Sequence, residues 1–149
     1  MLSQQEMSDR LEIQDLLASY CEAIDSRNWN ALDDIFTADA VIDYTEAGGA
    51  RGNLTETKAY LERALKQFSG MQHMLGLPII KIMGDTATSR TIAFNPMVVE
   101  RDGQPHTFFV GIWYCDELTR TEAGWRIRHR REELSYFHNL PNDFAAAET

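Results

Sequence analysis

The chain has 149 residues, 44% hydrophobic and 25% charged, a length and composition that suit a folded domain with a buried core. Its 23 acidic and 14 basic residues give a formal net charge of −9, which disfavours nucleic acids and anionic membrane surfaces as partners. The polar N-terminus shows no signal segment, and Cys21 and Cys115 lie far apart in the sequence, which predicts free thiols in the cytoplasm.

The first part of the chain predicts two helices and a strand. Residues 8–25 carry apolar side chains at the spacing of one helical face, which is typical of an amphipathic helix. A second, short helix is expected over about 29–37, with Asn28 as its N-cap. The segment AVIDY, residues 40–44, then indicates a brief strand.

A third helix is predicted after EAGGARG. In Asn53-Leu54-Thr55-Glu56, the Asn stands at the N-cap and the Glu at the N3 position of a capping box. The hydrophobic period then changes to two, with glycine-containing turns between the runs, which indicates a series of hairpins. The expected strands cover residues 72–83, 86–100, 106–120 and 124–137.

Helices that precede an antiparallel meander predict an α+β fold, with three N-terminal helices packed on a curved, mostly antiparallel sheet. We expect a single domain over 1–149, in which 1–7 and 140–149 are flexible or interface tails. The basic run RIRHRREE, at 126–133, lies in strand-like sequence and is interpreted as a sheet face rather than a nucleic-acid site.

His73 is the residue with the clearest chemical potential. It stands between two methionines, in MQHM, at the start of an apolar run. The four histidines are scattered without HxH or HxxxH spacing, so no metal site is expected. His73 could be a buried residue that binds a backbone carbonyl, or it could be a catalytic base.

The segment IQDLLASYCEAIDSRNWNALDDIFTADAVIDY, then a helix, a lone histidine on a strand and a closing GWRIRHRR, resembles the SnoaL-like family. This family belongs to the nuclear-transport-factor-two-like superfamily, whose fold is a cone-shaped α+β barrel. The resemblance covers nearly the whole chain and implies the same cone here. Because the superfamily hosts many activities, the reaction has to be argued from individual residues.

The scytalone and bile acid dehydratases of this group have pocket residues that match Tyr20, Asp25, His73 and Tyr44. A hexachlorocyclohexane dehydrochlorinase of the superfamily also uses an Asp–His pair, but it has a lysine in place of Tyr20. The resemblance therefore implies catalytic roles for Tyr20, Asp25 and His73, and substrate binding by Tyr44. Both dehydratases have a further aspartate or histidine that residues 86–99 lack, so the group that protonates a leaving hydroxyl is not identified.

An Asp–His pair is suited to proton transfer. Histidine has an unperturbed pKa of about 6.5, so it can take or give a proton near neutral pH. A carboxylate bonded to one ring nitrogen fixes the tautomer and makes the other nitrogen a better base. We expect His73 to remove a proton next to a carbonyl, or from a ring that becomes aromatic, while Tyr20 or Tyr44 donates a hydrogen bond to the developing oxyanion.

Three other residues are candidates for substrate binding. Asn95 is the only strong hydrogen-bonding amide on its strand. His129 and Arg131 share the parity of the apolar residues of the last strand, so they point inward if that strand has no bulge. Arg131 would then bind a carboxylate or an enolate oxygen, or alternatively form a surface ion pair with Glu132 or Glu133.

These features predict a cofactor-independent, dehydratase-like lyase or isomerase that acts on a small, hydrophobic, cyclic molecule. The dehydratase relatives imply a homotrimer, and dimers are also common in the superfamily. One alternative is a non-catalytic ligand-binding or assembly subunit that resembles the β subunit of ring-hydroxylating dioxygenases. Another is a polyketide cyclase, which uses a comparable acid–base pair on a different substrate.

Overall fold

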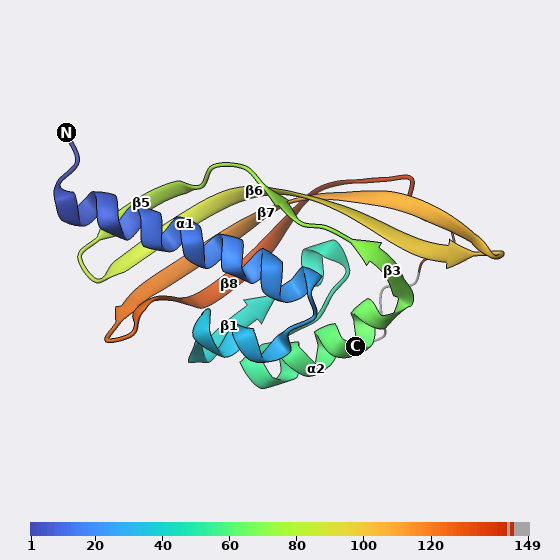
Figure 1. Cartoon of the computed structure of the whole chain (residues 1–149), viewed down its shortest axis with the longest axis horizontal. Helices are drawn as coiled ribbons and strands as arrows, with labels where there is room; N and C mark the ends of the chain where they lie inside the picture. Colours follow the sequence, from blue (N-terminus) through green and yellow to red (C-terminus); the bar gives the residue numbers. More distant parts are fainter. Residues whose placement is uncertain (143, 145–149) are drawn as a thin grey trace.

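The computed structural model describes residues 1–142 and 144. Helices come first and a long antiparallel meander comes last, as predicted (Figure 1). Short 3-10 helices are labelled η. The elements are α1 (Gln4–Asp25), η1 (Trp29–Asp34), β1 (Phe36–Asp43), η2 (Thr45–Ala47), β2 (Arg51–Asn53), α2 (Leu54–Ala64), η3 (Leu65–Gln67), β3 (Phe68–Met71), β4 (Met74–Leu75), β5 (Ile79–Met83), β6 (Thr86–Arg101), β7 (Gln104–Thr121) and β8 (Gly124–His138).

A mixed sheet of eight strands forms the framework, in the order β2-β1-β8-β7-β6-β3, with β4 and β5 also paired to β6. The β1–β8 pair is parallel, and the other pairs among the described strands are antiparallel. α1 crosses the sheet over β8, and α2 lies beside β1 (Figure 1). The predicted α+β architecture, with helices packed on a mostly antiparallel sheet, is confirmed.

α1 begins earlier than predicted because Ser3 caps it. The Ser3 hydroxyl accepts a hydrogen bond from the Glu6 N–H at 3.1 Å, and the Glu6 carboxylate accepts one from the Ser3 N–H at 3.0 Å. This reciprocal capping box satisfies N–H groups that the helix itself leaves unpaired. Residues 4–7, expected to belong to a tail, therefore form the first helical turn. The predicted apolar stripe is buried: Ile13, Leu17, Tyr20 and Ile24.

The second helix differs from the prediction. It is a 3-10 helix that ends at Asp34, and Asn28 makes no side-chain cap. The chain leaves α1 through Arg27, which has a left-handed φ of 57°. β1 then starts at Phe36, before the predicted residue 40, because Phe36 already pairs with Ile127 of β8. Tertiary pairing thus converts the end of the predicted helix into strand.

The predicted strand over 72–83 is interrupted twice. Its residues form β4 and β5, and the preceding β3 ends at Met71. The backbone N–H of His73 donates to the Asp25 carboxylate at 2.8 Å instead of to a neighbouring strand. Pro78 has no N–H to offer to a ladder. The break before β4 is what leaves His73 free to turn toward α1.

The last described residue, Phe144, packs on β3 and β7. The sequence predicts a tail over 140–149, of which positions 143 and 145–149 lie outside the described residues. The ring of Phe144 stacks on Phe68 with 6.2 Å between centroids, and it also packs on Phe108. This aromatic cluster closes one side of the internal space described below.

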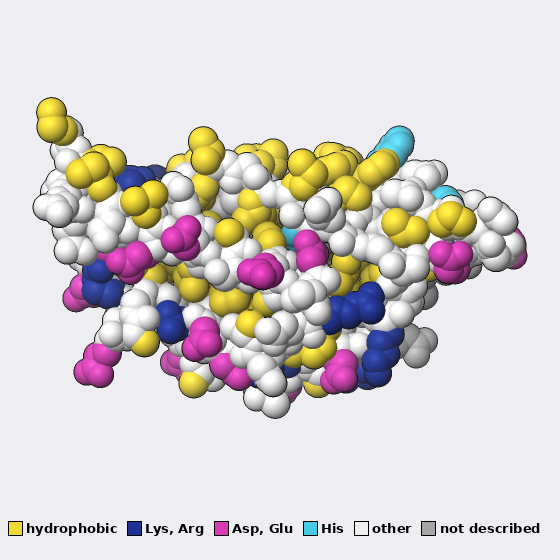
Figure 2. All heavy atoms as spheres, viewed as in Figure 1, with side chains coloured by type: hydrophobic (Ala, Val, Ile, Leu, Met, Phe, Trp, Pro, Cys, Tyr) yellow, Lys and Arg dark blue, Asp and Glu magenta, His cyan; other side chains and the backbone are white. Residues whose placement is uncertain are grey.

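Apolar side chains are also exposed along the outer edge of the sheet, over β4, β5 and β6 (Figure 2). We call this surface the β4–β6 patch. It is made of Met74, Leu77, Ile79, Met83 and Ile92.

Candidate active site

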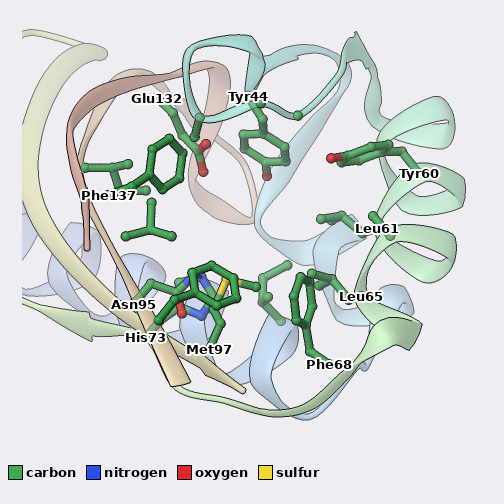
Figure 3. A pocket seen from close by; sticks show the side chains of 18 of the residues that line it. Tyr44, Tyr60, Leu61, Leu65, Phe68, His73, Asn95, Met97, Glu132 and Phe137 are labelled. Atoms are coloured by element: carbon green, nitrogen blue, oxygen red, sulfur yellow. Dashed lines mark hydrogen bonds between the residues drawn. The ribbon is translucent and has the colours of Figure 1, made fainter. Parts of the chain in front are cut away.

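A cavity of about 120 Å³ lies between α1, α2 and the sheet (Figure 3). Its volume is of the order that accommodates one benzene-sized ring. The walls are mainly apolar. In Figure 3, His73 and Asn95 lie on one side of the cavity, and Glu132 and Tyr44 lie on the opposite side. The cavity is therefore an apolar chamber with hydrogen-bonding groups on two facing walls.

His73 and Asp25 are in direct contact. The ring Nδ1 of His73 lies 2.6 Å from Asp25 Oδ1, and the His73 backbone N–H donates to Oδ2 at 2.8 Å. Asp25 ends α1, so its carboxylate reaches the break before β4 and holds both the backbone and the ring of His73. Because both oxygens are engaged, the imidazole is fixed in position and orientation.

The other ring nitrogen of His73, Nε2, contacts Asn95 at the wall of the cavity. A carboxylate on Nδ1 favours the tautomer with the proton on that nitrogen, so Nε2 carries the lone pair and acts as a hydrogen-bond acceptor. The Asn95 side chain reaches it from β6, with Nδ2 3.1 Å from Nε2, and the amide N–H donates. His73 and Asn95 line the cavity, and Asp25 stands behind the ring. Asp25, His73 and Asn95 therefore form a hydrogen-bonded chain that ends at the wall of the cavity.

Tyr20 and Tyr44 lie against each other on the cavity wall. Their hydroxyl oxygens are 2.7 Å apart, and both side chains are buried. Burial raises the pKa of Tyr20 to about 12 and that of Tyr44 well above its usual range, so both phenols are neutral. A pair of hydroxyls shares one proton between them and leaves one O–H as a donor. Gly49 permits this position, because a Cβ there would lie 2.6 Å from that of Tyr44.

Arg130 holds Tyr20 from behind. It is fully buried, with its guanidinium 4.0 Å from the centroid of the Tyr20 ring and 4.2 Å from that of Tyr114. Asp116 neutralises it through two hydrogen bonds of 2.7 and 2.8 Å. This bidentate ion pair with stacked aromatic rings fixes the wall of the cavity but does not line it.

Glu132 is a cavity residue that sequence reasoning missed as a site candidate. It is partly exposed, and it lines the cavity. Removal from solvent raises the pKa of its carboxyl from 4.5 to about 8, so the group is mainly protonated at neutral pH. Within residues 1–142 and 144, its carboxyl has no hydrogen-bond or ion-pair partner. The sequence could have indicated Glu132 only if a bulge in β8 had been assumed, because the bulge places Arg130 and Glu132 on the inner face.

That bulge also corrects the prediction for His129 and Arg131. Leu118 of β7 pairs with Ile127, but the preceding Glu117 pairs with His129, so β8 contains one extra residue at this point. The extra residue reverses the alternation of side chains. The expected inward orientation of His129 and Arg131 is therefore wrong, and Arg130 and Glu132 point inward instead.

On the outer face, His129 and Arg131 interact with acidic side chains. His129 Nδ1 lies 3.8 Å from a Glu117 oxygen. Arg131 forms ion pairs with Glu46 at 3.0 Å and with Glu133 at 3.3 Å. The alternative of a surface ion pair with Glu133 is the correct one.

Other sequence expectations concern metals, thiols and membranes. Among the described residues, no three His, Cys, Asp or Glu side chains cluster in a way that could hold a metal ion. Cys21 and Cys115 are free thiols. None of the helices in the described part of the chain combines the length and apolarity that a bilayer-spanning segment needs.

Comparisons with known proteins agree with this architecture. An uncharacterized protein of Mycobacterium tuberculosis, Rv2910c, is 49% identical over 140 residues, which are 94% of each chain. A structure from Novosphingobium aromaticivorans, described as a "putative aromatic ring hydroxylase", superposes with a TM-score of 0.80 at 28% identity, covering 90% of this chain and 94% of that one.

Two more distant structures share the fold. A "putative scytalone dehydratase" from Novosphingobium aromaticivorans has a TM-score of 0.82 at 14% identity, covering 97% of this chain and 95% of that one. A hexachlorocyclohexane dehydrochlorinase, LinA type 2, has a TM-score of 0.79 at 16% identity, with 91% of both chains covered. The SnoaL-like domain matches residues 5–131. The chain therefore belongs to the SnoaL-like family.

Proposed function

We propose that this protein is a cofactor-independent lyase or isomerase, dehydratase-like, that acts on a small, hydrophobic, cyclic molecule. One observation carries the proposal: Asp25 holds Nδ1 of His73 at 2.6 Å, and Nε2, which accepts a hydrogen bond from Asn95 in the free protein, lies at the wall of an apolar cavity. A base at the wall of an apolar cavity, held in one orientation by a carboxylate, is suited to abstraction of a weakly acidic C–H proton.

In the proposed reaction, His73 Nε2 accepts a proton from the carbon next to a carbonyl group. The Asn95 amide, which contacts Nε2 in the free protein, moves to the substrate when Nε2 takes the proton. The O–H donor of the Tyr20–Tyr44 pair stabilises the negative charge that develops on the carbonyl oxygen. A β-hydroxyl then leaves as water, or the proton returns at another carbon and the product is an isomer.

The size and lining of the cavity support a small substrate. A volume of about 120 Å³ suits one ring and few substituents. The walls provide apolar contact for a ring and only a few polar groups for orientation, as is usual in small-molecule sites.

The experiment uses 3-hydroxycyclohexanone as a probe in D₂O, with exchange of its α-protons followed by ¹H NMR. We expect His73→Ala to lower the exchange rate at least about 100-fold, since a positioned base contributes about 10²–10⁴-fold. Asp25→Asn should also lower it, because the amide can favour the wrong tautomer of the ring. His129→Ala, which removes a surface imidazole, is the control and should exchange normally. Full exchange by the His73→Ala variant would refute the proposal.

A second candidate is a non-catalytic subunit that resembles the β subunit of ring-hydroxylating dioxygenases. The similarity to a structure described as a "putative aromatic ring hydroxylase", at 28% identity, favours it. Such a subunit needs no oriented Asp–His pair. Co-purification of the tagged chain with an iron–sulfur protein from its native cells, together with unchanged function of the complex in His73→Ala, would support this candidate instead.

We also propose that the protein is a homo-oligomer, as a trimer or a dimer. The β4–β6 patch supports this proposal, because contiguous exposed apolar side chains mark association surfaces. Light scattering of the wild type and of Ile79→Glu checks it. The variant should dissociate, and a wild type that is monomeric at micromolar concentration would contradict the proposal.

A further inference from the structure

We propose that Glu132 is the general acid of this site, and that its carboxyl group protonates the leaving hydroxyl on the cavity wall that faces His73. This assignment rests on the proposed function and supplies the proton donor that the resemblance to dehydratases left unidentified. It also makes the substrate class more specific, as an uncharged β-hydroxy carbonyl compound.

The position of Glu132 is set by β8. The bulge opposite Glu117 turns Glu132 toward the helices, and the carboxyl lies beside Tyr44 across the cavity from His73 and Asn95 (Figure 3). A substrate bound between these walls would present a C–H bond to one side and its leaving group to the other. The proposed base, His73, and the proposed acid, Glu132, therefore lie at opposite ends of the bound substrate.

Glu132 has the protonation state that an acid needs. Two charged groups shift the pKa of Glu132: Asp43 on β1 and Arg130 on β8. Four tyrosines also interact electrostatically with its carboxyl: Tyr20 on α1, Tyr44 just after β1, Tyr60 on α2 and Tyr114 on β7. Burial outweighs the opposing charge of Arg130, and Asp43 adds to the rise in pKa. Arg130 is already neutralised by Asp116, so no cation pairs with Glu132 among the described residues.

The proposed step is balanced without another reactant. His73 Nε2 takes the α-proton, and the electron pair of that C–H bond becomes the new C=C bond through the enolate. The C–O bond breaks with its electron pair on oxygen, and the proton of Glu132 joins that oxygen to release water. The imidazolium of His73 then returns its proton to Glu132 through water, which restores both groups.

The charges of the lining point to an uncharged substrate. Neither Lys nor Arg contributes to the described lining of the cavity, whose acidic member is Glu132. A substrate carboxylate in this apolar space would lie near the carboxylate of Asp25, with no Lys or Arg of the described lining to neutralise it. A ketone or an alcohol meets hydrogen-bond partners on both walls at no such cost.

The first test measures the carboxyl itself in the full chain. Protein labelled with ¹³C at glutamate carboxyl carbons is titrated by NMR, and the Glu132 signal is the one missing from Glu132→Gln. We expect it to titrate near pH 8. Glu133, the next residue, points outward, and Arg90 lowers the pKa of its carboxyl, so it is the internal reference. A Glu132 signal that titrates near 4.5 would overturn the proposal.

The second test separates the acid from the base, with 3-hydroxycyclohexanone as the probe. In Glu132→Gln we expect water loss to fall about 10²–10⁴-fold while α-proton exchange stays within a few-fold of wild type. With 3-acetoxycyclohexanone, whose acetate leaves as an anion, the same variant should eliminate at nearly the wild-type rate. Glu133→Gln should behave as wild type with both probes.

The outcomes distinguish the two proposals. If Glu132→Gln keeps its water loss, or loses exchange and water loss equally, Glu132 is not the acid. If His73→Ala keeps exchange, the proposed function fails, and the carboxyl titration then decides whether Glu132 is held in the acid form.

Discussion

Replacing Glu132 by Gln should stabilise the protein, by an amount that grows as the pH rises. Burial raises the pKa of this carboxyl from 4.5 to about 8. A group whose folded pKa lies above its unfolded pKa binds its proton more tightly in the native state, so its contribution is fully present below 4.5. As the pH rises from 4.5 to 8 that contribution is lost, because the native state retains a proton that the unfolded chain releases.

The magnitude follows from the same two pKa values. One pH unit corresponds to about 1.4 kcal/mol for one proton, so the wild type should lose about 1.4 kcal/mol per pH unit relative to Glu132→Gln. The difference should level off above pH 8 at about 4–5 kcal/mol. Small domains have unfolding free energies of about 5–15 kcal/mol, so this effect would be a large share of the total.

The assay is urea unfolding followed by tryptophan fluorescence at each pH unit from 5 to 9. Subtracting the wild-type free energy from that of Glu132→Gln cancels the other titrating groups. Glu133→Gln is the matched control, because Arg90 lowers the pKa of Glu133 and its effect on stability does not change above pH 5. A difference between wild type and Glu132→Gln that stays constant from pH 5 to 9 would refute the reasoning.

Other substitutions test the supports of the site. Arg130→Met leaves the buried Asp116 carboxylate without its partner and should cost about 3–5 kcal/mol in urea unfolding; a loss below about 1 kcal/mol would contradict the pairing. Arg120 holds the pKa of the buried Asp9 well below its usual range, so Asp9→Asn should destabilise the protein at pH 7. The variant should also lose less stability than the wild type as the pH falls below about 4, and an equal loss in both proteins would contradict this role of Asp9. Asn53→Ala removes the cap of α2 and should lower the free energy of unfolding by about 1 kcal/mol. An unchanged free energy of unfolding would show that the cap does not stabilise the helix.

The α-helices α1 and α2 could be predicted from the sequence because the forces that form them act over a few residues. The Asn53 cap and the periodic apolar positions of α1 and α2 are local patterns, and the structure has these helices where the patterns indicate them. The expectation that Asp25 and His73 meet came from the family resemblance. The contact itself spans 48 residues, and only the packing of α1 against the break before β4 produces it.

The tertiary structure alone decided which face of β8 meets the cavity. Trp125 and Ile127 alternate with arginines, and the polar run RHRREE that follows contains no mark of the extra residue. That residue appears only when β8 pairs with β7 on one side and β1 on the other, and one shift of register exchanges the two faces of a strand. Glu132 therefore points into the cavity, and His129 and Arg131 point away from it, because strand pairing between distant segments outweighs local parity.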